Sequence, residues 1–347
     1  ETKIREFYAR MFFSILAAER GYSVVLGSRG HMLRFSKKLK KGIFLSNGNT
    51  QRLSSVSDRF KSLGFKVGHL DEEGAITFDY QHHIFRFDFD LFKKIDFFFS
   101  VGEREKQAIL SNNLKGEPHK KIYVTGNNRF DMLGKKFHNL YDEDVKNIKK
   151  KYGNFVLITT KFNKINVVKK NDEDDYVKRS SEGGYIRREI DHYFANESVK
   201  NDKKTMAELE IFLKELKTNF PNIKFLLKPH PGENFNYWTQ FKKNINQPNL
   251  EIIPINEFHT NAFILASDFL IASNCTTLLE GYLLNKLGIN FLPYENSKVH
   301  YELTKTLSEN CYSKKELIFK VKEALNKKLF NKKKLSENEQ KVLLFTI

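Results

Sequence analysis

Hydrophobic residues in the first half of the chain recur at two spacings that alternate along the sequence. Apolar residues at helical spacing predict a helix with one buried face near the N-terminus, which ends at Gly21. Short apolar or β-branched runs predict strands, and further helices fall between them. The predicted strands cover residues 23–26, 42–45, 66–70, 95–101 and 122–125, and the helices cover 4–16, 31–40, 51–63 and 103–112.

The second half resumes this alternation after a polar helical stretch at residues 135–151, which we interpret as the crossing between two domains. The polar stretch 164–201 is expected to be an irregular insertion or acceptor-side loop. The predicted strands cover 155–160, 224–227, 250–253, 269–272 and 289–292, and the helices cover 203–219, 257–266, 276–285 and 312–328, with another starting near 235.

Strands that alternate with helices of this length are typical of βαβ units and of a parallel sheet. We therefore predict an α/β protein with two Rossmann-like, doubly wound domains that face a central cleft. Ligands of such sheets bind at the carboxyl ends of the strands. The predicted N-terminal domain covers residues 1–141, the C-terminal domain 142–312, and a basic helical tail 313–347.

The composition favours a globular protein in a reducing compartment. Of the 347 residues, 40% are hydrophobic and 29% are charged. No apolar run approaches the length of about 18 residues that a membrane span needs. The two cysteines, Cys275 and Cys311, lack metal-ligand spacing, so we expect no metal and no disulfide framework. The chain opens in an amphipathic helix without a signal pattern, from which we expect an upstream strand and a cytoplasmic location.

The charge is strongly basic, with 59 Lys and Arg against 42 Asp and Glu and a formal net charge of +17. One interpretation is a nucleic-acid-binding protein. The lysines are scattered over many predicted helix faces, which favours instead a lysine-rich composition without a nucleic-acid partner. A third interpretation is peripheral contact with an anionic membrane at its inner face. The densest basic run is in the tail: Lys314, Lys315, Lys320, Lys322, Lys327, Lys328 and Lys332–Lys334.

A histidine flanked by prolines follows the predicted strand 224–227. The run is Lys228-Pro229-His230-Pro231-Gly232-Glu233. The prolines restrict φ and hold the imidazole in place, so His230 could donate a proton or a hydrogen bond to a leaving phosphate. The alternative is a histidine that merely caps a rigid turn.

Hydroxyl-bearing residues follow the predicted strand 269–272 and begin the next helix. The run is Ser273-Asn274-Cys275-Thr276-Thr277, with Glu280 one turn further on. Backbone N–H groups at a helix N-terminus, together with these hydroxyls, form a possible anion site, and Glu280 could bind a ribose. Simple N-capping is the alternative for Ser273 or Thr276.

Two further strand ends carry polar groups. Asp71, Glu72 and Glu73 precede Gly74, and like charges in a cleft favour a general base among them, whereas a solvated acidic turn is the alternative. Thr125-Gly126-Asn127-Asn128-Arg129 follows the predicted strand 122–125. Asn127 could face the cleft and Arg129 could bind phosphate, or the segment is a helix cap. Asp88-Phe89-Asp90 alternates with phenylalanines as in a half-buried strand and is interpreted as structural, and His82-His83 lack a third metal ligand.

These stretches together resemble a family of bacterial surface carbohydrate biosynthesis proteins. They occur in the same order and spread over residues 5–293. The matching pieces are Arg5-Glu6, 16–21 (LAAERG), 70–74 (LDEEG), 125–131 (TGNNRFD), 228–233 (KPHPGE) and 273–280 (SNCTTLLE). Asn128 stands where the family often has proline.

The resemblance extends to bacterial sialyltransferases, polysialyltransferases and Kdo transferases. It implies a GT-B glycosyltransferase that moves a CMP-activated 2-keto sugar acid onto a surface-polysaccharide or lipid-linked glycan, with no cofactor. Glu72 or Glu73 would be the general base, with Glu72 favoured, and His230 would assist departure of the phosphate. The implied donor-binding residues are Lys228, Pro231, Glu233, Ser273, Asn274, Thr276, Thr277 and Glu280, and the implied cleft residues are Asp71, Gly126, Asn127 and Arg129.

The sequence also allows three other functions. The Thr-Gly-Asn and His-Pro pieces also resemble non-hydrolysing UDP-GlcNAc 2-epimerases, which share the fold and would act on a free nucleotide sugar without an acceptor. A nucleic-acid-binding protein would bind duplex with a steep salt dependence. An inactive scaffold in a polysaccharide assembly complex would bind no nucleotide.

Overall fold

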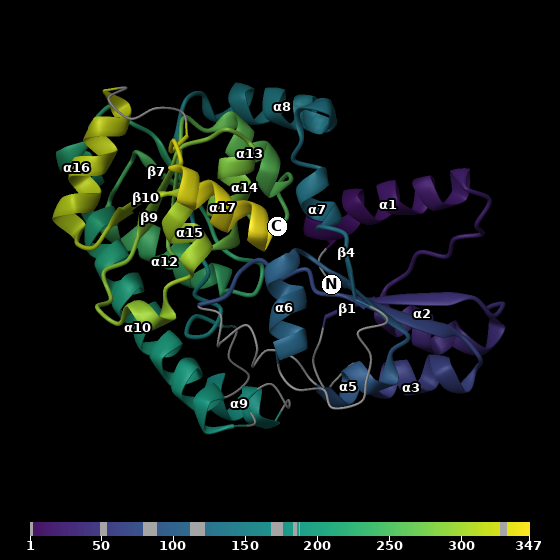
Figure 1. Ribbon diagram of the computed structural model, residues 1–347. Helices are drawn as coiled ribbons and strands as arrows, with labels where there is room; N and C mark the ends of the chain where they lie inside the picture. The colour runs from purple at the N-terminus through teal and green to yellow at the C-terminus, as the bar shows by residue number, and fades with distance from the viewer. Residues whose placement is uncertain are drawn as a thin grey trace. The chain divides into compact units, whose positions relative to one another are not determined.

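The computed structural model describes residues 3–48, 54–78, 89–111, 122–167, 176–182, 186, 188–326 and 332–347. The chain divides into two compact units (Figure 1). The first unit comprises Glu1–Met132, Ser180–Arg187 and Glu337–Ile347, and the second comprises Leu133–Arg179 and Arg188–Ser336.

The first unit is built on a four-stranded parallel sheet in the order β1-β2-β3-β4. Its strands are β1 (Ile43–Asn47), β2 (Lys66–Leu70), β3 (Phe97–Ser100) and β4 (Ile122–Val124). Its helices are α1 (Lys3–Glu19), α2 (Arg29–Phe35), η1 (Ser36–Lys38), α3 (Ser54–Ser62), α5 (Phe89–Lys94), α6 (Glu103–Ser111), α7 (Asn128–Asp131) and α17 (Glu337–Thr346).

The core of the first unit forms where the strands meet the helices. Phe44 of β1 stacks on Phe60 of α3 with ring centroids 3.6 Å apart. Gly68 in β2 is required by close packing, because a Cβ there would lie 1.9 Å from Cε2 of Phe97 in β3. The sheet therefore admits no larger residue at Gly68 unless the Phe97 ring moves.

His69 of β2 lies fully buried in this core. Its Nδ1 donates to the carbonyl oxygen of Gly48 (3.0 Å), and its Nε2 accepts from the hydroxyl of Ser57 (3.0 Å). Burial lowers the pKa of His69 to about 4; the hydrogen bond to Gly48 opposes this shift, and the nearby charge of Arg29 adds to it. The imidazole is therefore neutral when the chain is folded at neutral pH.

Replacing His69 by Gln should remove part of the acid sensitivity of the first unit. The unfolded chain protonates His69 near pH 6.5 and the folded chain near pH 4, so the unfolded chain binds more protons between these values. Stability from this group is complete above pH 6.5 and falls as the pH drops toward 4, by about 3 kcal/mol in all. Hydrogen exchange of the β2 amides should show the wild type losing stability relative to His69→Gln across this window. A difference that does not change with pH would contradict this assignment.

The second unit is built on a six-stranded parallel sheet in the order β10-β9-β8-β5-β6-β7. Its strands are β5 (Val156–Thr159), β6 (Phe225–Lys228), β7 (Leu250–Ile252), β8 (Leu270–Ala272), β9 (Gly288–Phe291) and β10 (Glu309–Cys311). Its helices are η4 (Lys135–Tyr141), α8 (Asp142–Tyr152), α9 (Tyr176–Glu182, which ends in the first unit), α10 (Glu189–Lys214), α11 (Leu216–Asn219), α12 (Phe235–Ile245), α13 (Thr260–Ala266), α14 (Thr276–Leu283), η5 (Ser297–Val299), α15 (Glu302–Leu307) and α16 (Lys314–Leu325).

The order in which strands are added to the sheet of the second unit switches sides between β5 and β8, while all strands stay parallel. β5, β6 and β7 follow one another to one side, whereas β8, β9 and β10 follow one another to the other side. Strands β5, β6 and β8 are fully buried, which explains their continuous apolar sequences. Ligands of open α/β sheets bind at the carboxyl ends of the strands next to such a switch point.

The fold class expected from the sequence is confirmed, because each unit carries a parallel sheet with alternating helices of the Rossmann type. The basic tail divides between the units. α16 packs into the second unit through Leu317 and Val321, and α17 belongs to the first unit. The tail lysines Lys327 and Lys328 lie outside the described residues.

Three predictions of secondary structure were wrong. Residues 23–26 form no strand, and Val24, Val25 and Leu26 are exposed. A β-branched run becomes a strand only where a neighbouring strand supplies hydrogen bonds, and none of the described strands pairs with it. Residues 164–201 are not one irregular loop, because α10 begins at Glu189. Buried polar residues on α10, among them Ser198 and Asp202, hide its amphipathic pattern.

The proposed half-buried strand around Asp88-Phe89-Asp90 is also wrong in its described part, since α5 begins at Phe89. Asp88, His82, His83, Gly183 and Gly184 lie outside the described residues.

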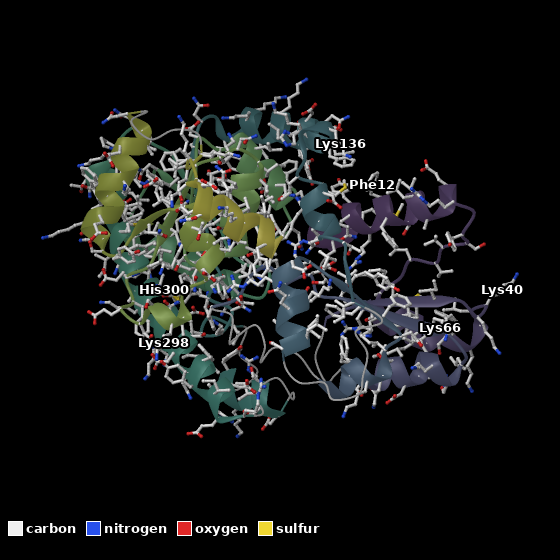
Figure 2. The ribbon with its side chains drawn as sticks, in the orientation of Figure 1. Phe12, Lys40, Lys66, Lys136, Lys298 and His300 are labelled. Atoms are coloured by element: carbon white, nitrogen blue, oxygen red, sulfur yellow. The ribbon has the colours of Figure 1, made fainter. Side chains whose placement is uncertain are left out.

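Basic side chains are spread over both units. The labelled lysines Lys40, Lys66 and Lys136 project from the ribbon in Figure 2, and all three are exposed. Among the described residues, no helix is both long enough and apolar enough to span a membrane.

Candidate functional site

The polar residues predicted in the second unit gather at the carboxyl ends of β5, β6 and β8, which are neighbours in the sheet. Thr159 ends β5 and Thr160 follows it, the His230 loop follows β6, and residues 273–277 follow β8. The hydroxyls of Thr159 and Thr277 are 2.7 Å apart, which joins the end of β5 to the first turn of α14. The sheet order therefore brings together segments that are more than 100 residues apart in the chain.

Glu233 organises the loop that carries His230. Its buried carboxylate accepts hydrogen bonds from the hydroxyl of Thr160 (2.7 Å), the indole N–H of Trp238 (2.8 Å) and the backbone N–H of Phe162 (3.0 Å). It also accepts from the backbone N–H of His230 (3.2 Å) and the amide of Asn166 (3.4 Å). Burial raises the pKa of Glu233, and these hydrogen bonds oppose that shift. Glu233 thus holds the His230 loop in place, and its buried carboxylate is not positioned to contact a nucleotide sugar.

His230 is the partly exposed residue of this loop that can act on a ligand. Its Nδ1 accepts a hydrogen bond from the backbone N–H of Gly232 (3.0 Å). The proton of the neutral imidazole therefore resides on Nε2, which can donate to an anionic oxygen. Pro231 next to it is exposed. The geometry agrees with the positioned histidine expected from the flanking prolines.

Lys228 is turned inward and does not serve as a surface cation. Its Nζ donates to the carbonyl oxygens of Glu257 (3.1 Å) and Ile255 (3.3 Å) and lies 4.9 Å from the ring centroid of Phe263. Burial lowers the pKa of Lys228 to about 8, although the nearby carboxylate of Glu257 opposes the shift. This lysine braces the segment after β7.

The segment after β8 combines structural and ligand-accessible groups. Asn274 has a left-handed backbone (φ 50°) and is buried; its N–H donates to Oδ1 of Asn290 (2.9 Å) and its side chain donates to the carbonyl oxygen of Val299 (2.7 Å). Asn274 therefore shapes the loop. Ser273 and Thr276 are partly exposed where α14 begins, and Glu280 is buried one turn further along.

Lys161 was missed in the sequence analysis. It lies two residues beyond the end of β5, with its Nζ 3.4 Å from the hydroxyl of Tyr301 and 4.4 Å from the centroid of that ring. The sequence could have indicated Lys161, because it places a cation just after a fully buried strand, where ligand-binding side chains of such sheets occur. Its charge also acts on Cys275, the residue that precedes α14.

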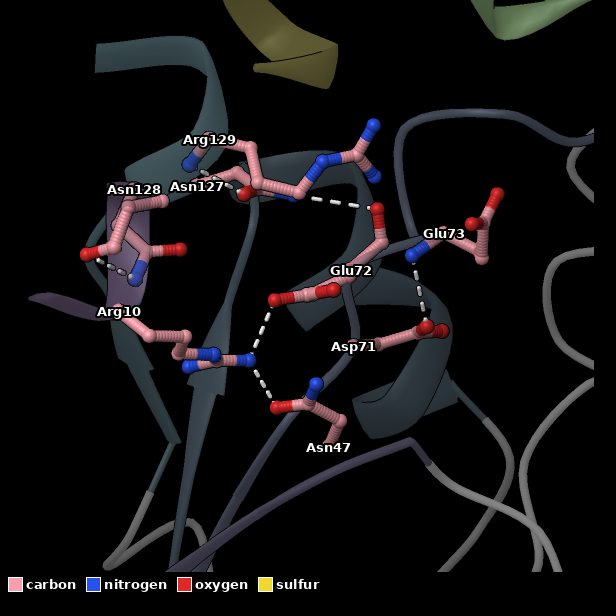
Figure 3. A network of polar contacts seen from close by, with 9 residues as sticks. Arg10, Asn47, Asp71, Glu72, Glu73, Asn127, Asn128 and Arg129 are labelled. Atoms are coloured by element: carbon pink, nitrogen blue, oxygen red, sulfur yellow. Dashed lines mark hydrogen bonds and ion pairs between the residues drawn. The ribbon is translucent and has the colours of Figure 1, made fainter. Parts of the chain in front are cut away.

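The predicted residues of the first unit gather at the carboxyl ends of β1, β2 and β4 (Figure 3). Glu72 forms an ion pair with Arg10 of α1, and Arg10 also donates to the side chain of Asn47 at the end of β1. Arg10 was not predicted, because a single arginine within an apolar helix pattern carries no motif. Asp71 and Glu72 are buried, and Glu73 is partly exposed.

The Thr-Gly-Asn segment joins this network. Gly126 has a positive φ of 78°, which permits the tight turn expected of it. The side chain of Asn127 donates to the carbonyl oxygen of Glu72 (3.1 Å) and accepts from the N–H of Arg129 (3.0 Å), which caps α7. Arg129 is buried beside them. Among the described residues, no group of three or more His, Cys, Asp or Glu is arranged to hold a metal ion.

Solved structures with a similar fold include UDP-GlcNAc 2-epimerases. The Methanocaldococcus jannaschii UDP-GlcNAc 2-epimerase in complex with UDP-GlcNAc and UDP has a TM-score of 0.53 at 16% identity, and the match covers 92% of this chain and 81% of that one. S. aureus MnaA with UDP has a TM-score of 0.53 at 15% identity, covering 89% and 74%. The Neisseria meningitidis UDP-GlcNAc 2-epimerase bound to UDP-GlcNAc has a TM-score of 0.53 at 16% identity, covering 86% and 72%.

These matches show the GT-B fold for this chain. No protein-family model matches the sequence, and no curated protein is similar enough to count as a relative. The comparisons overturn the function first favoured by the sequence, transfer of a CMP-activated sugar acid, since the similar structures include several UDP-GlcNAc 2-epimerases. The similarity to sialyl- and Kdo transferases is not supported, and the epimerase alternative fits the findings better.

Proposed function

We propose that this protein binds a UDP-linked sugar and inverts a stereocentre of the sugar ring, as UDP-GlcNAc 2-epimerases do. The observation that carries the proposal is the shared fold over 86–92% of the chain with proteins that hold UDP or UDP-GlcNAc. The second support is that a histidine, a lysine and several hydroxyls, all side chains that can bind phosphate, lie at the carboxyl ends of β5, β6 and β8.

In this proposal the second unit binds the nucleotide. Nε2–H of His230 donates to a phosphate oxygen, and the cation of Lys161 adds electrostatic attraction. The hydroxyls of Ser273 and Thr276 and the free N–H groups at the start of α14 bind further phosphate oxygens. Glu280 lies one turn into that helix and suits a ribose hydroxyl pair. Lys228, Glu233 and Asn274 hold these groups in place without touching the ligand.

The chemistry needs a carboxylate as well. Inversion at C2 requires that the C2 hydrogen leave as a proton and that a proton return to the opposite face. A proton at a carbon without a neighbouring carbonyl leaves only if a group on the next carbon departs. The C1–O bond to the nucleotide therefore breaks, its electron pair goes to the phosphate, and a C1–C2 double bond forms until the reverse addition. Asp71, Glu72 and Glu73 are the candidate proton acceptors.

The proposal is tested with free nucleotide sugar and no acceptor glycan. Incubation with UDP-GlcNAc in D₂O should produce a second UDP-sugar by NMR, with deuterium at C2 of both isomers. UDP should raise the melting temperature, whereas CMP at the same salt and concentration should not. Stabilisation by CMP alone, or the absence of C2 exchange in a chain that binds UDP, would contradict the proposal.

A further inference from the structure

We propose that Glu73 is the carboxylate that exchanges the proton with the sugar, and that Arg10 positions it by engaging Glu72 and Asn47. This inference rests on the proposed function and decides between the candidate carboxylates of the first unit. The family resemblance of the sequence favoured Glu72.

Burial separates the three carboxylates. Asp71 is 2% exposed and Glu72 is 6% exposed, whereas Glu73 is partly exposed. A proton acceptor must approach within hydrogen-bond distance of the carbon-bound hydrogen that it removes. Of the three residues, Glu73 is the most exposed and therefore the one best placed to meet a substrate.

The carboxylate of Glu72 is already engaged. Arg10 Nη2 donates to Oε1 of Glu72 and to Oδ1 of Asn47, and the side chains of Arg10 and Glu72 are only 14% and 5% exposed. A buried ion pair resists the loss of either charge, because the remaining charge would be desolvated and unpaired. A residue that has to gain and lose a proton in each turnover does not suit this position.

The backbone around Glu73 is held from several sides. Oδ1 of Asp71 accepts from the N–H of Glu73 (3.0 Å), and the carbonyl oxygen of Glu72 accepts from the side chain of Asn127 (3.1 Å). A Cβ at Gly74 would lie 2.4 Å from Oε1 of Glu105, so the turn lies directly against α6. Figure 3 shows the side chain of Glu73 directed away from the Arg10–Glu72 pair. The network therefore fixes the backbone at Glu73, whose side chain is partly exposed.

The test compares two isosteric variants of adjacent residues. Glu73→Gln should lower the rate of C2 deuterium exchange by about 10³-fold, within the usual range for loss of a general base, with the UDP-induced melting shift retained. Glu72→Gln should instead lower the melting temperature, because it leaves Arg10 facing a neutral amide. Glu103→Gln on α6, whose side chain is 43% exposed, is the matched control and should leave exchange unchanged.

A readout specific to catalysis is rescue by a small carboxylate. Added formate should restore exchange in Glu73→Ala and not in Glu72→Ala. Arg10→Met should lower kcat by about 10- to 100-fold with little change in KM, since a misplaced catalytic group costs rate more than binding. Arg10→Lys, which keeps the charge, should recover part of that loss.

The outcomes separate this inference from the proposed function. Failure of the wild type to exchange the C2 hydrogen would contradict both the epimerase proposal and the assignment of Glu73. Exchange by the wild type and by Glu73→Gln at similar rates, or formate rescue of Glu72→Ala alone, would overturn the assignment of Glu73 and leave the epimerase proposal standing. Unchanged kcat in Arg10→Met would overturn the positioning role of Arg10.

Discussion

Replacing Glu233 by alanine is expected to lower the free energy of unfolding of the second unit by about 3–5 kcal/mol. The carboxylate accepts hydrogen bonds from five donors, and the side chain is only 2% exposed. Alanine would leave these donors buried without an acceptor, at a cost of about 1–3 kcal/mol for each donor that water does not reach. Water entering the cavity would recover part of that loss.

Trp238 reports this change directly, because its indole N–H donates to Glu233 and it is the one tryptophan of the chain. Its fluorescence, followed during guanidinium unfolding, gives the midpoint for the second unit. Glu233→Gln should be less destabilising, since one acceptor oxygen remains. Glu295→Ala, at an exposed position, should leave the midpoint near that of the wild type. A Glu233→Ala midpoint equal to that of Glu295→Ala would show that the network does not hold the loop.

The sequence predicted which segments of the second unit form the candidate site, but not which of their side chains are buried. Buried strands followed by His230 and by Ser273–Thr277 are local signals, and the sheet order brings them together as predicted. Lys228 and Glu233 belong to the same motif, yet they point inward. Glu233 meets Thr160 across 73 residues of sequence and Lys228 meets Glu257 across 29, and a local motif does not reveal such pairings.

In the first unit, too, local motifs could be read from the sequence and long-range contacts could not. The carboxylates of residues 71–73 were found because acidic residues at a strand end are conspicuous. Arg10 was not found, since its role depends on α1 lying beside the ends of β1 and β2. The strand expected at 23–26 failed for a related reason: hydrogen bonding to a neighbour, and not the β-branched sequence alone, decides whether a segment becomes a strand.

The nucleotide could not be predicted from these motifs. Hydroxyls at a helix N-terminus and a histidine after a strand recognise phosphate, and a buried glutamate suits ribose. None of these groups distinguishes one pyrimidine from the other, because cytosine and uracil differ only at the edge of the base. The sequence therefore pointed to a nucleotide sugar in a GT-B fold and gave no physical basis for preferring CMP to UDP.

Replacing His230 by alanine is expected to weaken UDP binding by about 10- to 150-fold, the usual value of a hydrogen bond to a charged group of 1.5–3 kcal/mol. Gly232 donates to Nδ1, so Nε2 carries the proton that the phosphate would accept. Calorimetry with UDP and with uridine separates this contact from collapse of the loop, since uridine lacks the phosphates. His230→Ala should lose affinity for UDP and keep its affinity for uridine. His230→Asn should retain part of the UDP affinity through its amide N–H. The control His192→Ala, at an exposed position on α10, should change neither affinity. Equal losses for UDP and uridine would mean that the loop has collapsed, and no loss for either would remove His230 from the phosphate site. The first result would make His230 a structural residue like its neighbour Glu233, and the second would leave Lys161 and the start of α14 as the groups that bind the diphosphate.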